Sequence, residues 1–295
     1  MLQAYGALIL IKMEKQMKEY KNGVYTGERA LYNTHGATVD GCVFEDGESP
    51  LKESSELDIK NSEFRWKYPL WYCKGVSAEN TTLRLTARSG IWYTHGISFK
   101  DSLIEAPKTF RRSSGISLLR TDMPNAEETL WGCRDVRIKD VKAVGDYFGM
   151  NADGVYAENL SLDGNYAFDG GKNIEICSSR LISKDAFWNT ENVTVRDSYI
   201  EGEYLGWNSK NLTFINCTLE SNQGLCYIEN LKMVNCTLIN TDLAFELCTV
   251  DCDIVSHIDS VKNPISGKIR AKSIGEIILD SDIIDPKRTE IITEE

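Results

Sequence analysis

The chain has 295 residues, of which 42% are hydrophobic and 26% charged, and this balance excludes a disordered chain. Its 44 Asp and Glu side chains outnumber its 33 Lys and Arg side chains, which gives a formal net charge of −11. That charge argues against a nucleic-acid backbone or an anionic membrane as the main partner. An acidic protein can still bind acidic sugars through a local patch.

We expect neither a membrane span nor a secretion signal at the start of the chain. Its longest uncharged stretch, 1–11, is far shorter than the roughly 20 residues that a membrane helix needs. It also lacks a basic start and a small-residue cleavage site, so we expect a cytoplasmic protein. The nine cysteines form no paired Cys-x-x-Cys sets, and we expect reduced, buried thiols and no zinc or iron–sulfur site.

A repeat of 19 to 21 residues organises the chain. Three adjacent copies read VTVRDSYIEGEYLGWNSKN, LTFINCTLESNQGLCYIEN and LKMVNCTLINTDLAFELCT. The same register gives about twelve units over residues 37 to about 264, which begin at Ala37, Leu57, Val76, Ile97, Ile116, Val136, Val155, Ile174, Val193, Leu212, Leu231 and Val250.

Each unit opens with the pattern of two short strands. Apolar residues two apart face one side of a strand, and the change of parity after the third position requires a bend. An Asn or Asp, which tolerates a left-handed backbone, fills that corner at Asn61, Asn80, Asp101, Asp140, Asn159, Asp197, Asn216 and Asn235. A second Asn column closes later units at Asn173, Asn192, Asn211 and Asn230.

A strand-type unit that returns every 19 to 21 residues, with no helical stretch, predicts an all-β chain coiled as a parallel β-solenoid. Coils stacked at about 4.8 Å make a rod on the order of 55 Å long. Leucine-rich repeats have a similar period, but their Leu-x-x-Leu-x-Leu frame is absent. We expect an N-terminal cap over 1–36, the solenoid over 37–264, and C-terminal cap strands and tail over 265–295.

The repeat resembles the single-stranded right-handed parallel β-helix of the pectate lyase-like superfamily. The runs DGESPLKES, FRWKYPLWY, PNAEETLW, GDYFGMN, KDAFWN and EYLGWNSKNLTF resemble those of a bacterial family known only as a domain of unknown function. This second resemblance spans nearly the whole chain. It implies a right-handed β-helix fold and a bacterial origin, with no established activity.

Charged and aromatic residues gather in the second half of the units, and equal offsets in successive coils predict that they form one face of the rod. Aromatic rings, carboxylates and guanidinium groups along such a face suit an extended sugar chain. Our candidates for substrate binding are Trp131, Tyr147, Tyr166, Asp185, Trp188, Tyr204 and Trp207.

Two enzymatic arrangements fit this face. In β-elimination on a uronate, a Lys or Arg base removes a proton beside a carboxylate whose charge a cation neutralises. In hydrolysis, two carboxylates flank the scissile bond about 5 to 9.5 Å apart, which stacking on neighbouring coils provides. The candidate catalytic residues are Lys108, Arg111, Arg112, Glu127, Glu128 and Asp146, and we assign no metal ligands and no cofactor, although Ca²⁺ would suit the elimination.

Packing alone also explains these residues. Stacked rings stabilise a solenoid, and Trp188 with Trp207, Phe168 with Phe187, and Tyr147 with Tyr166 share columns. Charges on a solvated face commonly form ladders of ion pairs.

The aspartate set of polygalacturonases, with its Gly-His-Gly, is missing, which weighs against a hydrolase. We therefore expect a carbohydrate-binding or carbohydrate-modifying protein, a lyase or glycosidase if it is an enzyme. The alternative is a non-catalytic scaffold that binds a protein or a second copy of itself.

Overall fold

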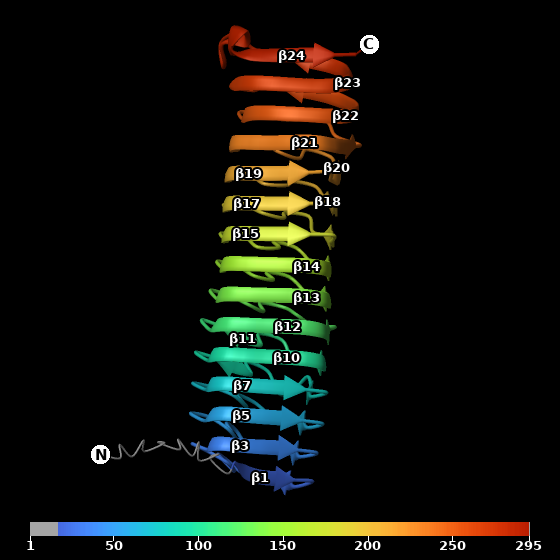
Figure 1. Ribbon diagram of the computed structural model, residues 1–295. Helices are drawn as coiled ribbons and strands as arrows, with labels where there is room; N and C mark the ends of the chain where they lie inside the picture. Colours follow the sequence, from blue (N-terminus) through green and yellow to red (C-terminus); the bar gives the residue numbers. More distant parts are fainter. Residues whose placement is uncertain (1–16, 295) are drawn as a thin grey trace, which may run out of the picture.

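The structure, a computed structural model, describes residues 17–294 and shows a rod of stacked β-strands. The strands on the near side run from left to right while the chain climbs from the blue end to the red end, so the coil is right-handed (Figure 1). The expected all-β, right-handed parallel solenoid is therefore confirmed. Residues 1–16 of the expected N-terminal cap lie outside the described residues.

One strand of every coil joins a single parallel ladder along the rod. In order, its members are β1 (Lys18–Lys21), β3 (His35–Asp40), β5 (Ser55–Lys60), β7 (Lys74–Glu79), β10 (His95–Ile104), β12 (Ser114–Met123), β13 (Arg134–Val144), β14 (Asp153–Asp163), β15 (Lys172–Cys177), β17 (Glu191–Arg196), β19 (Lys210–Ile215), β21 (Glu229–Ile239), β22 (Thr249–Lys262), β23 (Ser266–Ile278) and β24 (Thr289–Thr293).

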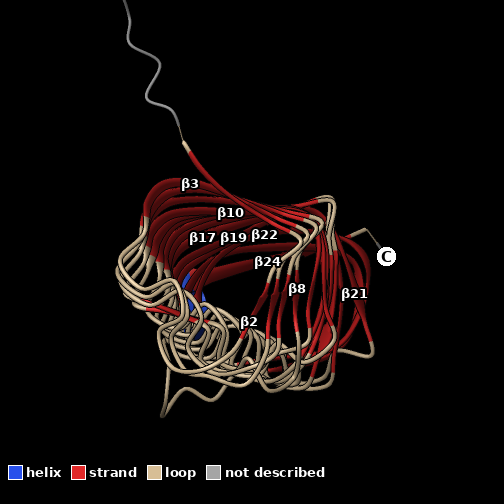
Figure 2. Ribbon diagram, turned by 90° about the horizontal axis from the view of Figure 1, so that it is seen from below, coloured by secondary structure: helices blue, strands red, loops and turns tan. Residues whose placement is uncertain are grey.

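A second ladder follows the corner of each coil. The longer strands of the first ladder turn this corner and supply it with their second halves. Elsewhere it consists of β2 (Val24–Tyr25), β4 (Val43–Phe44), β6 (Glu63–Phe64), β8 (Thr82–Leu83), β16 (Arg180–Ile182), β18 (Tyr199–Gly202) and β20 (Thr218–Ser221). Most loops gather on the remaining side, where β9 (Ile91–Trp92) pairs with β11 (Phe110–Arg111) (Figure 2). Over the described residues the only helical element is the 3-10 turn η1 (Pro286–Arg288).

The register of the ladder is the one that the repeat predicts. Ala37 lies opposite Leu57, Leu57 opposite Val76, and each later unit start opposite the next, as far as Val250. The described coils number about 15 rather than twelve, because β1 precedes the predicted series and β23 and β24 follow it. The division into two caps and a solenoid stays a prediction.

The interior of the rod is filled by the apolar columns of the repeat. Phe44 and Phe64 stack with ring centroids 4.6 Å apart, and the unit starts are all buried. Small polar side chains line the corner next to them, where the Oγ of Ser62 accepts a hydrogen bond from the Cys42 backbone N–H. A hydroxyl of this kind accepts a hydrogen bond from a backbone N–H of the preceding coil. The buried N–H group at that corner therefore has a hydrogen-bond partner.

The Asn and Asp corners adopt the expected left-handed backbone, with φ of 50° at Asn61 and 48° at Asn80. Their side chains also bond from coil to coil, since the Asn80 amide donates to Asn61 Oδ1 at 2.8 Å. The second Asn column forms a ladder of the same kind, in which Asn211 donates to Asn192 Oδ1 at 2.8 Å. The corner residues therefore fix both the bend and the alignment of the coils.

All nine cysteines are free, and eight of them are buried. Burial raises the pKa of the Cys73 and Cys133 thiols to about 12. No helix within residues 17–294 is long and apolar enough to cross a membrane. A cytoplasmic location stays a prediction.

The inward column predicts a large effect for Leu219, whose side chain is fully buried on β20. We expect Leu219→Ala to lower the free energy of unfolding by about 2 to 5 kcal/mol, because it removes buried methyl groups and leaves a cavity. Chemical denaturation followed by circular dichroism measures this loss. The outward-facing Thr213→Ala should change stability by less than about 0.5 kcal/mol, and an equal loss in both variants would contradict the assignment of inward positions.

Candidate functional site

Most residues of the predicted face fall in the turns between the corner strand of one coil and the first strand of the next. These loops gather on one side of the rod (Figure 2). Backbone hydrogen bonds keep its loops in line: Arg112 N–H donates to Trp131 O at 3.0 Å, and Glu128 N–H donates to Asp146 O at 2.8 Å. Residues at equal offsets therefore lie on neighbouring coils. The structure thus brings Glu128 and Asp146 onto adjacent coils, as the sequence predicts.

The aromatic rings of this face form a continuous band along nine coils. Trp71 stacks on Trp92 at 5.1 Å, and Tyr147 stacks on Tyr166 at 4.9 Å with nearly parallel planes. Tilted or edge contacts link the others. We call this set the aromatic band, and its members are Trp71, Trp92, Trp131, Tyr147, Tyr166, Trp188, Trp207 and Tyr227, with Arg111 between Trp92 and Trp131.

The band is held by packing and by hydrogen bonds to the backbone. The indole N–H of Trp92 donates to Lys108 O at 3.0 Å, and that of Trp188 donates to Tyr204 O at 2.6 Å. Where two rings stack face to face, each covers a face that a sugar ring would need. The contact between Trp188 and Trp207, at 6.0 Å, confirms their shared column and favours packing as its purpose.

Arg111 and Lys108 share one carboxylate. The Arg111 guanidinium lies 4.9 Å from the Trp92 ring centroid and 4.7 Å from that of Trp131. Its Nη2 bonds Glu128 at 2.7 Å, and Lys108 Nζ bonds the other oxygen of Glu128 at 2.9 Å. The buried Arg111 Nε has no hydrogen-bond partner in the described structure. These contacts give Arg111 a structural role as the cation between two indoles.

The charge state of Glu128 follows from these partners. Partial burial acts to raise the pKa of its carboxyl, but the hydrogen bonds from Lys108 and Arg111 outweigh burial and hold the pKa below its usual range. Glu128 is therefore an ion-pair partner at neutral pH and a poor proton donor. Glu127 and Asp146 are exposed, and Asp146 accepts a hydrogen bond from Asn165 N–H at 2.7 Å.

Two further candidates differ in their access to solvent. Asp185 is only 3% exposed, and burial raises the pKa of its carboxyl. Its charge in turn raises the pKa of the nearby Tyr166 phenol. Tyr204 is half-buried beside Glu203, which raises the pKa of its phenol by accepting a hydrogen bond. Asp185 is therefore buried beneath the aromatic band, whereas Tyr204 is partly accessible to solvent.

A groove of about 680 Å³ opens beside the aromatic band, where the loops meet the first strands of the next coils. Arg112 and Trp131 are the two predicted site residues that line it. We call it the basic groove, and it is lined by His95, Arg112, Ser113, Ser114, Trp131, Gly132, Arg134, Asn151, Ala152, Asp153, Gly170 and Lys172.

Glycines hollow out this groove. Gly132 and Gly170 occupy a column that carries Tyr72 and Tyr93 in earlier coils, and their φ angles are +62° and +68°. A side chain at Gly170 would collide with the Asn151 amide. The missing side chains leave room for a ligand.

The charges of the basic groove are mostly cationic. Arg112 and Arg134 are exposed and make no ion pair with any described residue, whereas Lys172 pairs with Glu191 at 3.1 Å. His95 bonds Ser114 Oγ through Nδ1 at 2.8 Å. Asp153 is the one acid in the lining, and it accepts a hydrogen bond from Asn173 at 2.7 Å. The groove is therefore a local positive site on an acidic protein.

Residues 18–292 match the sequence pattern of a family described as a protein of unknown function, DUF3737. The chain belongs to this family. Among curated proteins, none matches the DUF3737 chain in sequence. The family resemblance inferred from the repeat is thereby confirmed, while a bacterial origin stays a prediction.

Several solved structures resemble the DUF3737 rod in overall shape. The surface adhesin PfbA of Streptococcus pneumoniae is 8% identical, with 89% of this chain and 81% of that chain covered and a TM-score of 0.35. The A-module of the Azotobacter vinelandii mannuronan C-5 epimerase AlgE6 is 12% identical, with coverages of 94% and 89% and a TM-score of 0.33. The catalytic domain of a GH87 α-1,3-glucanase in complex with nigerose is 10% identical, with coverages of 94% and 63% and a TM-score of 0.32.

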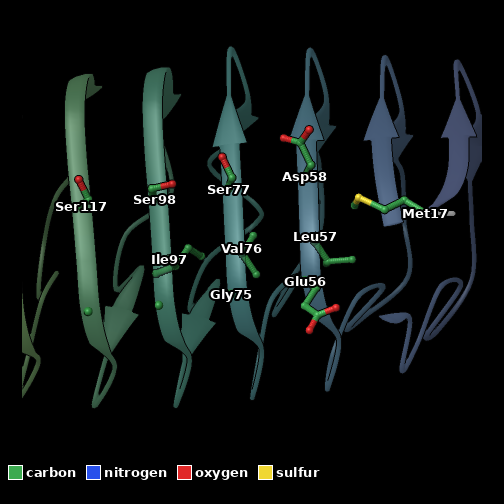
Figure 3. Close-up of a pocket in the computed structure, with 12 residues that line it drawn as sticks. Met17, Glu56, Leu57, Asp58, Gly75, Val76, Ser77, Ile97, Ser98 and Ser117 are labelled. Carbon is green, nitrogen blue, oxygen red and sulfur yellow. The ribbon is translucent and has the colours of Figure 1, made fainter. Parts of the chain in front are cut away.

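A second, shallower groove of about 440 Å³ crosses the outer face of β5, β7, β10 and β12 in the DUF3737 chain (Figure 3). Its floor is a stripe of small residues, with Ser77, Ser98 and Ser117 in register on neighbouring strands. Glu56 and Asp58 are the titratable groups in its lining, and both lie at the end near Met17. This groove offers little chemistry beyond hydroxyl groups.

The sequence interpretation missed Arg134, Lys172 and His95. These residues stand two positions before the first apolar residue of a unit, outside the half of the repeat that holds the predicted face. A signal was present, because Arg134, Asp153, Lys172, Glu191 and Lys210 share one offset in successive units and pair in register. The roles predicted for the other candidate residues stay predictions.

Two adjacent arginines test the division between the aromatic band and the basic groove. We expect Arg111→Ala to lower the free energy of unfolding by about 2 kcal/mol, because it removes two cation–ring contacts and an ion pair. Arg112→Ala should shift it by less than about 0.5 kcal/mol. Paired thermal and denaturant melts measure both values, and a larger loss for Arg112→Ala would show that the two roles are reversed.

The lowered pKa of Glu128 makes its contribution to stability depend on pH. A carboxyl with a lowered pKa in the folded state stabilises the fold above its unfolded pKa, and the effect disappears as pH falls through the folded value. Glu128→Gln should therefore melt below the wild type at pH 7, and the gap should close as pH falls below about 4. Melts across that range test this, and a gap that persists at pH 2 would rule out ion pairing as its origin.

Proposed function

We propose that this protein binds an acidic carbohydrate chain in the basic groove. The observation that carries the proposal is the pair of exposed guanidinium groups, Arg112 and Arg134, on neighbouring coils of the groove with no carboxylate partner among the described residues. On the same coil as Arg112, but in the aromatic band, Lys108 and Arg111 have their charges satisfied by Glu128. Unlike the aromatic band, the groove therefore offers two arginines ready for an external anion.

The chemistry of arginine points to a carboxylate or sulfate group. A guanidinium group presents planar paired donors that match such oxyanions, and it binds them more specifically than a lysine does. The net charge of −11 restricts this attraction to the groove, because the rest of the surface repels a long polyanion. A ligand whose acidic groups are spaced along an otherwise uncharged chain suits a positive groove on an acidic surface.

The neutral lining favours sugar hydroxyls between those charges. Ser114 and Asn151 offer donors and acceptors beside the arginines, and the edge of Trp131 offers an apolar wall. His95, Ser114, Arg134, Asp153 and Lys172 pair in succession across four coil steps, so the groove extends on the order of 19 Å along the rod. That length accommodates several sugar units of an extended chain.

The state of Glu128 supports binding rather than hydrolysis. A glycosidase needs one carboxyl that keeps a proton near neutral pH, and the pKa of Glu128 is shifted in the opposite direction. Glu127 and Asp146 do not line the basic groove. The proposed role therefore assigns Arg112 and Arg134 to ligand binding and assigns no residue to bond cleavage.

Isothermal titration with galacturonate oligomers, and with neutral galactose oligomers of equal length, tests the proposal. We expect the acidic oligomers alone to bind, and Arg112→Ala and Arg134→Ala each to weaken binding at least tenfold, which corresponds to about 1.4 kcal/mol. Arg137→Ala is the matched control, because Arg137 is equally exposed on β13 but lies outside the groove.

The controls separate this role from the scaffold alternative. All variants should retain the melting temperature of the wild type, since none of the three arginines makes an ion pair with a described residue. Absence of binding by uronate and sulfated oligomers, together with capture of a specific protein partner, would favour a scaffold. If Arg137→Ala and Arg134→Ala weakened oligomer binding equally, the effect would come from the overall charge of the protein and not from the basic groove.

A further inference from the structure

The two ends of the rod differ in how they present their last strand. β1 carries Lys18, Glu19 and Lys21 as exposed side chains, and charged residues of this kind discourage pairing at a sheet edge. β24 pairs with β23 on one side, and no described strand lies on its other side (Figure 1). Its sequence, Thr-Glu-Ile-Ile-Thr, contains one charge, and Glu290 is already paired with Lys268 at 3.2 Å.

The β24 end also leaves apolar side chains uncovered. Ile291 occupies the inward column above the fully buried Ile269, but it is only partly buried because no described coil lies over it. Ile277 and Ile283 are 46% and 58% exposed at the same end. A hollow of about 530 Å³ lies beside Ile283, and its lining mixes apolar residues with polar and charged ones: Leu247, Ile265, Ile283, Ile284, Pro286, Ser281, Asp282, Asp285 and Arg288. This end therefore has the composition of an interface rather than of a solvated cap.

We propose that two copies of the chain join end to end through β24. In an antiparallel pair centred on Ile291, each Ile291 faces its counterpart and Thr289 faces Thr293, so the edge is complementary to itself. Such a two-fold contact joins the two β24 strands and closes after two copies. Stacking of β24 on β1 would instead place an apolar strand against Lys18, Glu19 and Lys21 and would continue without limit.

The charges around the edge fit a two-fold partner. The segment before β24 carries Asp280, Asp282 and Asp285, followed by Lys287 and Arg288. None of these five side chains forms an ion pair with a described residue. A two-fold axis at β24 brings the acids of one copy toward the bases of the other, whereas a partner of a single sign would leave either the three acids or the two bases unmatched.

Sedimentation equilibrium and small-angle scattering of the full chain test this inference. We expect a species of twice the 33.2 kDa chain mass, with a maximum dimension about twice that of one rod. Ile283→Lys, alone and with Ile292→Lys, should return the protein to a single chain with unchanged circular dichroism. Leu85→Lys is the matched control, because Leu85 is also 58% exposed but lies far from β24, and it should remain a dimer.

Three results would overturn the proposal. These are a wild type that stays a single chain at every concentration, a dimer whose length equals that of one rod, and a dimer that survives the double substitution with its fold intact. A dimer lost equally in Leu85→Lys and Ile283→Lys would place the contact elsewhere. None of these outcomes affects the proposed sugar binding, because the basic groove is lined by residues between His95 and Lys172.

Discussion

The cross-coil backbone ladder is the constraint on which the rest of this structure depends. Because each coil hydrogen-bonds to the next in parallel register, residues about 19 positions apart lie directly above one another. Every structural feature then becomes a column: the apolar interior, the Asn corners, the aromatic band and the ion pairs. The fold is thus nearly one-dimensional, and each coil depends chiefly on its two neighbours.

The ladder explains what could be predicted from the sequence. The unit starts from Ala37 to Val250 were predictable because an inward apolar position cannot move by one residue without exposing its whole column. The terminal coils were not, since β1 retains little of the apolar pattern, and β23 and β24 begin after intervals that depart from 19 to 21 residues. The coil count was therefore too low by about three.

The candidate site was predictable as a face but not as a set of contacts. The period places Trp71, Trp92 and Arg111 in successive coils, yet it does not say that two rings stack face to face while a guanidinium group fills the next place. The basic groove also depends on side-chain direction around a corner, which the period does not encode. Electrostatics adds a second layer, since many cations of the rod bond to acids on a neighbouring coil. Hydrogen bonds from Arg65, on the same coil, and from Arg84, on the next coil, lower the pKa of Glu63 to about 2. Arg112 and Arg134 matter because both lack an acid partner among the described residues and both line the same groove.

The free thiols make each part of the rod chemically distinguishable. Cys42, Cys73, Cys133, Cys217 and Cys252 lie in five different coils, all buried and unpaired. A thiol enclosed in this way reacts with an alkylating reagent only when its own coil opens. The sulfur atoms therefore form a built-in series of reporters, and the order in which they become labelled would trace how unfolding spreads from one end of the rod to the other.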